Sequence, residues 1–288
     1  MGDLFRIAGQ NIRITDGRLC RLLFDFETPA AYENDPNTCQ FDMVRGDEYF
    51  DIQSHKLSHE VAHVFASDSC EGHFMMTNAD YSRATVFVSA KDEPANDLPI
   101  LLATGMDTGL PVELLLSFLY SRLAYTAQAA FVHASLVELP DLGGVMFVGR
   151  SGVGKTTQAR LWWKHQGATI INGDKVFLTM EDGCAWAHGS PWCGSSLFRL
   201  NRSTPLRGIV VLEQAPENRI RRLSDLEIMM QYVPHIFLPM WDGHLVDRVM
   251  DTVEQMLPTV PVFRLECRPD EEATALVRKA VFGGEAHE

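Results

Sequence analysis

From residue 130 onward, the chain alternates short apolar runs with longer segments in which apolar residues recur every three or four positions. The runs predict buried strands at residues 131–137, 145–148, 168–171, 176–179, 208–212 and 261–266. The periodic segments predict helices ending near His165 and beginning after Ser224, Asp242 and Asp270, whose side chains can cap the first helical amides. This alternation is typical of an α/β domain with a central sheet.

The first part of the chain has a different pattern of short strands and turns, for example at residues 11–14 and 84–88. Residues 92–111 carry three prolines and two glycines, which predicts a domain boundary or a long connection. Pro111 then opens a predicted helix that runs to about Gln128, and we interpret its apolar stripe as core packing. We therefore predict a β-rich N-terminal region at residues 1–108 and an α/β domain at residues 109–288.

The strongest chemical signal is a complete match to the P-loop pattern G-x-x-x-x-G-K-[ST] at residues 149–156. A predicted strand leads into it and a predicted helix follows, which is the context that a phosphate-binding loop requires. Glycines let successive amides point at a phosphate, Lys155 can reach the β- and γ-phosphates, and the Thr156 hydroxyl can bind Mg²⁺. The predicted nucleotide-binding residues are Gly149, Arg150, Ser151, Gly152, Val153, Gly154, Lys155, Thr156 and Thr157.

Two further residues are candidates for the chemistry around a bound triphosphate. His133 lies on the predicted strand before the loop strand, and Asp174 follows the predicted strand at residues 168–171. An aspartate at the end of such a strand can bind Mg²⁺ or accept a proton from an attacking hydroxyl, and the pattern leaves both roles open. Taken singly, His133 also fits a core histidine and Asp174 a turn residue. The candidate catalytic residues are Lys155, His133 and Asp174, and the candidate magnesium ligands are Thr156 and Asp174.

In motif order, residues 110–282 resemble the catalytic domain of the HPr serine kinase/phosphorylase family, which is related to phosphoenolpyruvate carboxykinase. The matching features are the strand around His133, the loop at residues 149–156, the acidic residue Asp174 and the Gly-x-Pro-aromatic-x-Gly turn at residues 189–194. The chain departs from the family at Gly173, where an aspartate is usual, and at Thr157, where a glutamate is usual. The resemblance implies a P-loop kinase domain at residues 109–288 that uses ATP and Mg²⁺.

The resulting hypothesis is an ATP-dependent kinase that acts on a Ser/Thr hydroxyl of a peptide or protein, or on a small alcohol. A nucleotide-binding regulatory or assembly protein that hydrolyses slowly or not at all is the alternative, because a P-loop alone does not separate these classes. The sequence leaves open the phosphoryl acceptor, the choice between ATP and GTP, and the oligomeric state. It is compatible with a homo-oligomer.

The composition of the chain limits which partners and which cellular compartment we expect. The net charge of −13 leaves no basic patch for nucleic acid, although distant surface charges do not prevent nucleotide binding because salt screens them within about 8 Å. No run approaches the roughly 20 apolar residues of a membrane span, and the start lacks a secretory signal, so we expect a cytoplasmic protein without a membrane partner. The six cysteines contain no Cys-x-x-Cys pair, which predicts free thiols.

A rival motif lies in the N-terminal region, where His59-Glu60-Val61-Ala62-His63 matches the H-E-x-x-H pattern of zinc hydrolases. The chemistry requires a helix, so that both histidines share one face and Glu60 acts as the general base. The glycine and third histidine of the metzincin continuation do not follow. Zinc hydrolysis is therefore the least favoured hypothesis.

Overall fold

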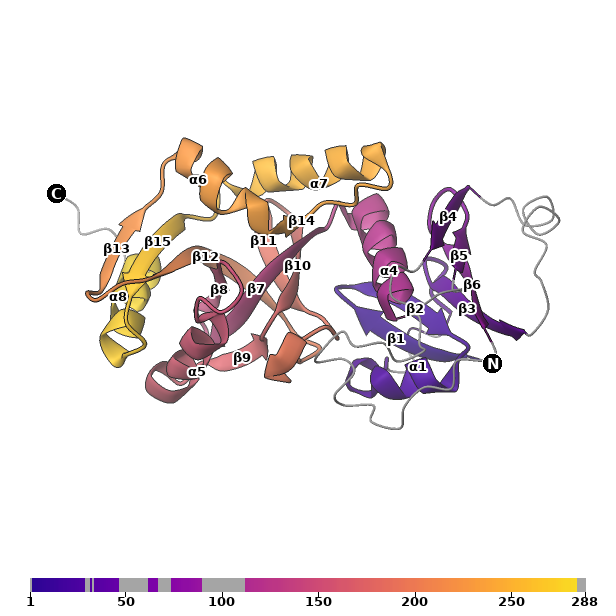
Figure 1. The fold of residues 1–288 in the computed structure, drawn as a ribbon, viewed down its shortest axis with the longest axis horizontal. Coiled ribbons are helices and arrows are strands. Elements are labelled where there is room, and N and C mark those ends of the chain that lie inside the picture. Colours follow the sequence, from indigo (N-terminus) through magenta and orange to yellow (C-terminus); the bar gives the residue numbers. More distant parts are fainter. Residues whose placement is uncertain are drawn as a thin grey trace. The chain divides into compact units, whose positions relative to one another are not determined.

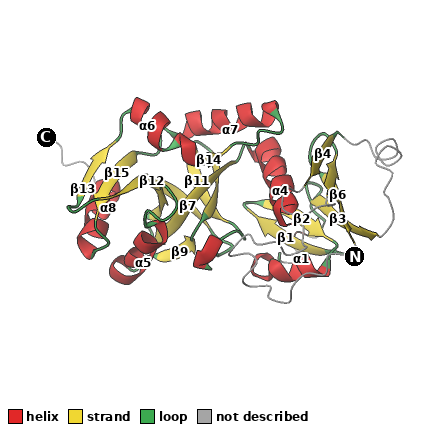
Figure 2. Cartoon of the chain, viewed as in Figure 1, coloured by secondary structure: helices red, strands yellow, loops and turns green. Residues whose placement is uncertain are grey.

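The computed structural model describes residues 2–28, 32, 34–46, 62–66, 74–89 and 112–283. The chain divides into two compact units, unit 1 at Met1–Thr126 and unit 2 at Ala127–Glu288. Both units contain helices and a sheet, which confirms a mixed α/β protein (Figure 2). In the part of the chain that the structure describes, every helix is too short or too polar to cross a membrane.

Unit 1 is built on a sheet with the strand order β1-β2-β3-β6-β5-β4. The β1–β2 hairpin turns at Ala8 and Gly9, both with positive φ, which matches the right-handed twist of the strands. The elements of unit 1 are β1 (Asp3–Ile7), β2 (Gln10–Ile14), α1 (Gly17–Leu22), η1 (Phe24–Phe26), β3 (Cys39–Gly46), β4 (His63–Ala66), β5 (Phe74–Thr77), β6 (Arg83–Ser89) and α4 (Val112–Ala127).

Helix α4 belongs to unit 1, which differs from the boundary predicted between residues 108 and 109. The ring of Phe118 lies 5.6 Å from that of Phe41 on β3. Arg122 donates to the backbone oxygen of Asp80 at 2.9 Å and pairs with its carboxylate at 3.3 Å. The apolar stripe of α4 therefore packs as the sequence predicts, but on the N-terminal sheet. The composition of residues 92–111 cannot show on which unit the next helix packs.

Unit 2 is built on a mixed sheet with the strand order β11-β10-β7-β8-β12-β15-β13, to which β9 and β14 add by pairing with β7. Strand β12 runs parallel to both β8 and β15, whereas β7 is antiparallel to β8 and β10. The strands of unit 2 are β7 (Ala130–Leu139), β8 (Gly143–Val148), β9 (Thr169–Asn172), β10 (Lys175–Glu181), β11 (Cys184–Gly189), β12 (Ser203–Gln214), β13 (Arg219–Arg222), β14 (Ile236–Phe237) and β15 (Val262–Cys267).

Helices cover both faces of this sheet. Figure 1 shows α5 and α8 on one side and α6 and α7 on the other. Trp162 of α5 packs edge-on against Phe147 of β8, with ring centroids 5.8 Å apart, in a core that also includes residues of α8. The helices of unit 2 are α5 (Lys155–Gln166), η3 (Gly194–Ser196), α6 (Asp225–Gln231), η4 (Val233–His235), α7 (Gly243–Met256) and α8 (Glu271–Phe282).

The predicted helix starts after Ser224, Asp242 and Asp270 are confirmed. Ser224 and Glu227 form a capping box, and the Asp242 and Asp270 side chains accept from backbone amides of α7 and α8. Each cap depends on a few neighbouring residues, so the sequence pattern is sufficient to place it.

Two features of unit 2 are absent from the strands predicted above. Residues 219–222 form the edge strand β13, antiparallel to β15. The side chains are largely exposed, so no apolar alternation marks the strand. The reversal between β7 and β8 lies at residues 140–142, and β8 begins at Gly143, two residues before the predicted strand at 145–148.

A buried histidine ties together three strands of unit 2. The ring of His188 is bonded at 2.8 Å through Nε2 to the Thr179 hydroxyl and at 2.8 Å through Nδ1 to the Ser203 hydroxyl. Thr179 in turn donates to Glu181, so the imidazole donates through Nε2 and accepts at Nδ1. Burial lowers the pKa of His188 to about 4.

We expect this histidine to make unit 2 sensitive to acid. Its folded pKa lies below the ordinary value of 6.5, so the unfolded chain binds more protons between these two values and stability falls as the pH drops through that window. From pH 7 to pH 5, the unfolding free energy should fall by about 2 kcal/mol more in the wild type than in His188→Gln. Denaturant unfolding followed by tryptophan fluorescence measures this, because all five tryptophans lie in unit 2. Equal losses in both proteins would contradict it.

Candidate functional site

The glycine loop, residues 149–154, connects the end of β8 to the start of α5. Gly149, Gly152 and Gly154 have φ values of 146°, 78° and 113°, which residues with a side chain rarely adopt. At Gly149 a Cβ would also lie 2.9 Å from Val153 Cγ1. The pattern of glycines therefore corresponds to a real requirement of this backbone, and the strand and helix predicted on its two sides are present.

Lys155 is the first residue of α5, and its side chain folds back over the loop. Its Nζ donates to the backbone oxygens of Gly149 at 2.9 Å and Arg150 at 3.3 Å, and the residue is 7% exposed. Burial lowers the pKa of Lys155, and the Asp174 carboxylate opposes that shift. The ammonium group is thus held by two neutral carbonyls, which phosphate oxygens can replace with stronger, charge-assisted bonds.

The neighbouring strands hold the loop and the first turn of α5 in place. The Ser135 hydroxyl of β7 donates to the backbone oxygen of Lys155 at 3.0 Å. On the other side, Gln214 at the end of β12 donates to the backbone oxygens of Gly152 and Val153, each at 3.4 Å. The sheet therefore supports the loop from both sides of β8.

His133 and Asp174 form a direct pair on the β7 side of the loop. His133 Nε2 lies 3.0 Å from Asp174 Oδ1. The antiparallel register places Lys175 of β10 opposite His133 of β7, and the amide of Ala134 donates to the backbone oxygen of Asp174 at 2.8 Å. The structure therefore brings together the two residues that the sequence analysis selected separately.

Burial and positive charge act in opposite directions on Asp174. Burial raises the pKa of its carboxyl, but the hydrogen bond and charge of His133, together with two nearby lysines, outweigh burial and leave the pKa below its ordinary value. Asp174 is therefore ionised at neutral pH. An ionised carboxylate can bind a metal ion, orient a hydroxyl and accept its proton where the reaction requires little base strength.

Asn172 sets the position of Asp174. The Asn172 side chain accepts from the amides of Asp174 at 2.8 Å and Lys175 at 2.9 Å, and donates to the backbone oxygen of Ser190 at 2.8 Å. The residue is fully buried. This arrangement is an Asx turn, and the hydrogen bond from Asn172 to Ser190 fixes the side chain that forms it. The turn places Asp174 two residues after the end of β9.

Thr156 and Asp174 can hold a magnesium ion in the presence of phosphates. The Thr156 hydroxyl donates to the backbone oxygen of Gly173 at 3.3 Å, so it lies beside the turn that carries Asp174. One hydroxyl and one ionised carboxylate fit Mg²⁺, which keeps several waters and takes its other oxygens from substrate phosphates. Among the described residues, no group of three or more His, Cys, Asp or Glu side chains forms a metal cage.

The position before Asp174 has no room for a side chain. A Cβ built on Gly173 would lie 2.5 Å from Ser196 Cβ and would overlap the Ser196 hydroxyl. Ser196 belongs to η3 and its hydroxyl is bonded to the backbone oxygen of Cys193. The glycine that departs from the resembled family is therefore required by the local packing of this chain.

A cavity of about 790 Å³ lies on the other side of the glycine loop, next to β12. One wall is the loop itself, and a second wall is the carboxyl end of β12 and Arg264 of β15. The segment from α6 to η4 forms the third wall, with Met230, Pro234 and His235 facing the cavity. Arg264 is paired with Glu213 and, at 3.1 Å, with Glu266.

Sequence reasoning missed the residues of this cavity outside the loop. Glu213 and Gln214 could have been predicted from the sequence. They lie at the carboxyl end of β12, which runs parallel to β8, and ligands usually bind at this edge of such a sheet. His235 could not have been predicted, since its position depends on the pairing of the two-residue strand β14 with β7.

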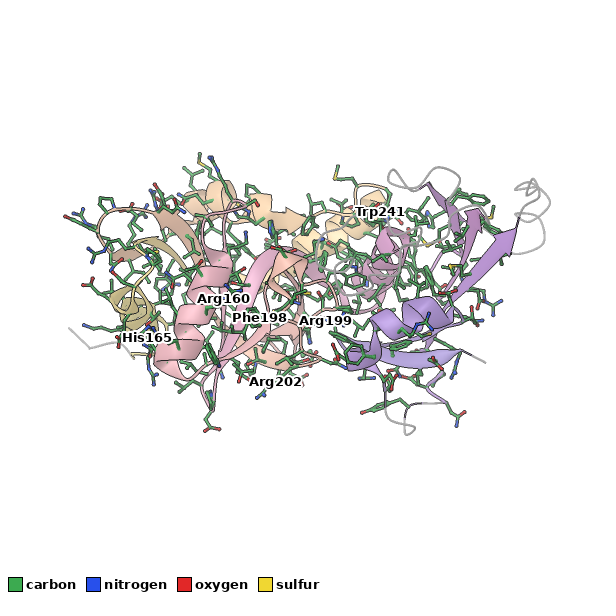
Figure 3. All side chains as sticks on the ribbon, turned by 60° about the horizontal axis from the view of Figure 1, so that its bottom comes forward. Arg160, His165, Phe198, Arg199, Arg202 and Trp241 are labelled. Carbon is green, nitrogen blue, oxygen red and sulfur yellow. The ribbon has the colours of Figure 1, made fainter. Side chains whose placement is uncertain are left out.

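Other side chains of unit 2 have structural partners. Arg202 pairs with Glu138 at 2.6 Å, and Trp192, in the turn at residues 189–194, is 5% exposed. Arg160 of α5 lies over the ring of Phe198 at 5.5 Å, and Figure 3 labels both side chains. The five described cysteines are free, and Cys70 lies outside the described residues.

The H-E-x-x-H pattern lies mostly outside the described residues. His59 and Glu60 lie outside the described residues, while His63 begins strand β4 and stacks on Tyr81 with ring centroids 4.7 Å apart. The zinc chemistry requires both histidines on one helical face. The strand that begins at His63 gives no support to that helical geometry, and the rest of the zinc-hydrolase prediction lies outside the described residues.

Comparison with known proteins finds only weak structural similarity. No protein-family model matches the chain, and no curated protein is significantly similar to it in sequence. Among solved structures, the chain is similar to the Hpr(Ser) kinase/phosphatase from Coxiella burnetii, with 12% sequence identity and a TM-score of 0.32. The similarity covers 53% of this chain and 94% of that one. A similarity of this size says nothing about activity, so the functional argument depends on the residues of the site.

Proposed function

We propose that the chain is an ATP-dependent kinase that transfers the γ-phosphoryl group to a hydroxyl acceptor, either a Ser/Thr side chain of a peptide or protein or a small alcohol. One observation carries the proposal. The glycine loop with its buried Lys155, the Thr156 hydroxyl and the His133–Asp174 pair all lie at the same end of β8. Phosphoryl transfer requires a phosphate cradle, a cation at the terminal phosphate, a metal ligand and an orienting group, and this set supplies each of them.

The residues divide the work as follows. The loop amides and Lys155 hold the phosphates, and Lys155 neutralises charge that develops on the transferred group. Thr156 and Asp174 are the ligands of Mg²⁺, which when bound supplies further neutralisation of phosphate charge. Asp174, held by His133, orients the acceptor hydroxyl and takes its proton as the new oxygen–phosphorus bond forms and the bond to the β-phosphate bridge breaks. Little base strength is needed, because such transition states are loose.

Label transfer tests the proposal directly. After incubation of the full chain with γ-labelled ATP, Mg²⁺ and a native extract, we expect label either in acid-precipitated protein as an acid-stable phosphoester or in a phosphorylated alcohol that is resolved from ATP and free phosphate. A slowly hydrolysing nucleotide-binding protein is the second candidate, and the single low-basicity carboxylate beside Gly173 favours it. Label that appears only in free phosphate would support this second candidate and contradict the kinase.

Replacement of Asp174 by asparagine tests whether the negative charge of its side chain, and not only its packing, is needed for phosphoryl transfer. We expect Asp174→Asn to keep the turn and the hydrogen bonds of its backbone but to lower transfer by about a hundredfold or more, since the charge is lost from both the metal ligand and the orienting group. Transfer is measured with saturating Mg-ATP. The matched control is Asp182→Asn in the exposed turn after β10, which should leave transfer unchanged. Transfer by Asp174→Asn at the wild-type rate would refute the assigned role.

A further inference from the structure

His235 occupies the wall of the cavity that faces the glycine loop. It is the last residue of η4 and lines the cavity together with loop residues 149–153. Strand β14 follows immediately and pairs antiparallel with β7, with Ile236 opposite Val132. One step further in this register, His235 stands opposite His133. The pairing of β14 with β7 therefore directs the imidazole toward the phosphate end of the site.

The same strand register relates His235 to the beginning of the loop. Ala134 of β7 lies opposite Val148, the last residue of β8. The next position on β7 is His133 and the next on β8 is Gly149. His133 and His235 thus lie at the level where β8 ends and the glycine loop begins. The loop reaches this level from one side and η4 from the other, and a ligand seated on the loop lies between them.

The charges that face His235 come from several elements. Lys155 and Arg150 face it from the loop and α5, and His133 faces it from β7. The cavity also contains Glu213 of β12 and Arg264 of β15, which form an ion pair with each other. Burial lowers the pKa of His235, and the positive charges of Lys155, His133 and Arg150 lower it further. The imidazole is therefore neutral in a positively charged environment that favours an anion.

We infer that His235 donates a hydrogen bond to the γ-phosphate of the bound nucleotide and so closes the phosphate site from the side opposite the glycine loop. The inference rests on the proposed function, since it assumes a nucleotide triphosphate on the loop. It adds a contact from the α6–η4 segment, which lies about 80 residues along the chain from the loop. His235 discriminates a triphosphate from a diphosphate, because a contact to the terminal phosphate is absent with ADP.

A bound triphosphate also changes the protonation of His235. Its negative charge reverses the local potential, which favours the imidazolium form that donates a stronger, charge-assisted bond. Nucleotide triphosphate binding should therefore be accompanied by proton uptake at His235. The γ-phosphate can also exchange a proton on binding, so only the difference between wild type and His235→Gln reports on the histidine.

The test compares affinities for Mg-ATP and Mg-ADP by calorimetry on the full chain. We expect His235→Ala to weaken Mg-ATP binding by about ten- to a hundredfold, as for loss of a hydrogen bond to a charged group, and to change Mg-ADP binding by less than about twofold. His235→Gln should retain part of the ATP preference, because the amide can donate, but should lose the proton uptake seen in buffers of different ionisation enthalpy. His244→Ala, an exposed histidine of α7, is the matched control.

The outcomes separate this inference from the proposed function. Equal weakening of ATP and ADP binding, or no change in either, would overturn the role of His235 while leaving the loop intact. An absence of ATP and ADP binding in the wild type, with no difference in Lys155→Ala, would refute nucleotide binding itself. Thermal unfolding of each variant shows whether it is folded, and His235→Gln provides the test if the alanine variant is not.

Discussion

Lys155→Ala should abolish the binding of a triphosphate at the glycine loop and reduce phosphoryl transfer by at least about a thousandfold. The ammonium group of Lys155 is buried and bonded to two loop carbonyls, at 2.9 Å and 3.3 Å. In the alanine variant these carbonyls face the phosphates without a cation between them, so the loop changes from attractive to weakly repulsive. The measurements are calorimetry with Mg-ATP and the rate of label transfer.

Two further variants define what Lys155 contributes. Lys164→Ala removes a lysine from the exposed face of the same helix α5 and should leave binding and transfer unchanged. Lys155→Arg keeps the charge but introduces a larger, planar group into a position that is 7% exposed. We expect it to bind poorly, because a guanidinium cannot replace a compact ammonium at this site. Binding by Lys155→Ala within threefold of the wild type would disprove the central role of the loop.

Gly173→Asp should inactivate the protein even though it introduces the second carboxylate of the resembled family. The new Cβ would lie 2.5 Å from Ser196 Cβ and overlap the Ser196 hydroxyl. The turn at residues 172–174 would have to move, and with it the Thr156–Gly173 hydrogen bond and the His133–Asp174 pair. A displacement of about 1 Å at such a site costs about a hundredfold in rate. Transfer from γ-labelled ATP measures the loss.

A compensating substitution distinguishes crowding from the effect of charge. Gly173→Asp combined with Ser196→Gly removes the two Ser196 atoms that a Cβ at position 173 would overlap, and we expect transfer to return to within tenfold of the wild type. Gly243→Asp is the control, because a Cβ at Gly243 meets nothing within 4 Å. If the double variant were as inactive as Gly173→Asp, the added negative charge and not the packing would be responsible.

The glycine loop shows how far local sequence is sufficient. Its glycines, the strand before it and the helix after it are all contiguous, so the pattern at residues 145–166 predicts them together. The three capped helices of unit 2 follow the same logic, since a cap and the amides that it receives lie within four residues. The edge strand β13 was missed for the opposite reason. It is defined by its pairing with β15, and its three arginines leave no clear alternation of apolar and polar residues.

The candidate site needed contacts between distant segments. His133 and Asp174 were each ambiguous in the sequence, and the antiparallel register of β7 and β10 makes them a pair. The cost of a side chain at position 173 depends on Ser196, and the role inferred for His235 depends on β14 pairing with β7. Helix α4 was assigned to the wrong unit because an apolar stripe shows that a helix packs, but not against which sheet.

By itself, the sequence determined the glycine loop with its flanking strand and helix, several of the longer strands of unit 2 and the capped helix starts, because these features depend on residues that are close along the chain. Only the tertiary structure decided which carboxylate and histidine meet, why position 173 must be glycine and which residues face the loop across the cavity. These features depend on strand register and on the packing of segments that are tens of residues apart, where small differences in free energy select one partner among many.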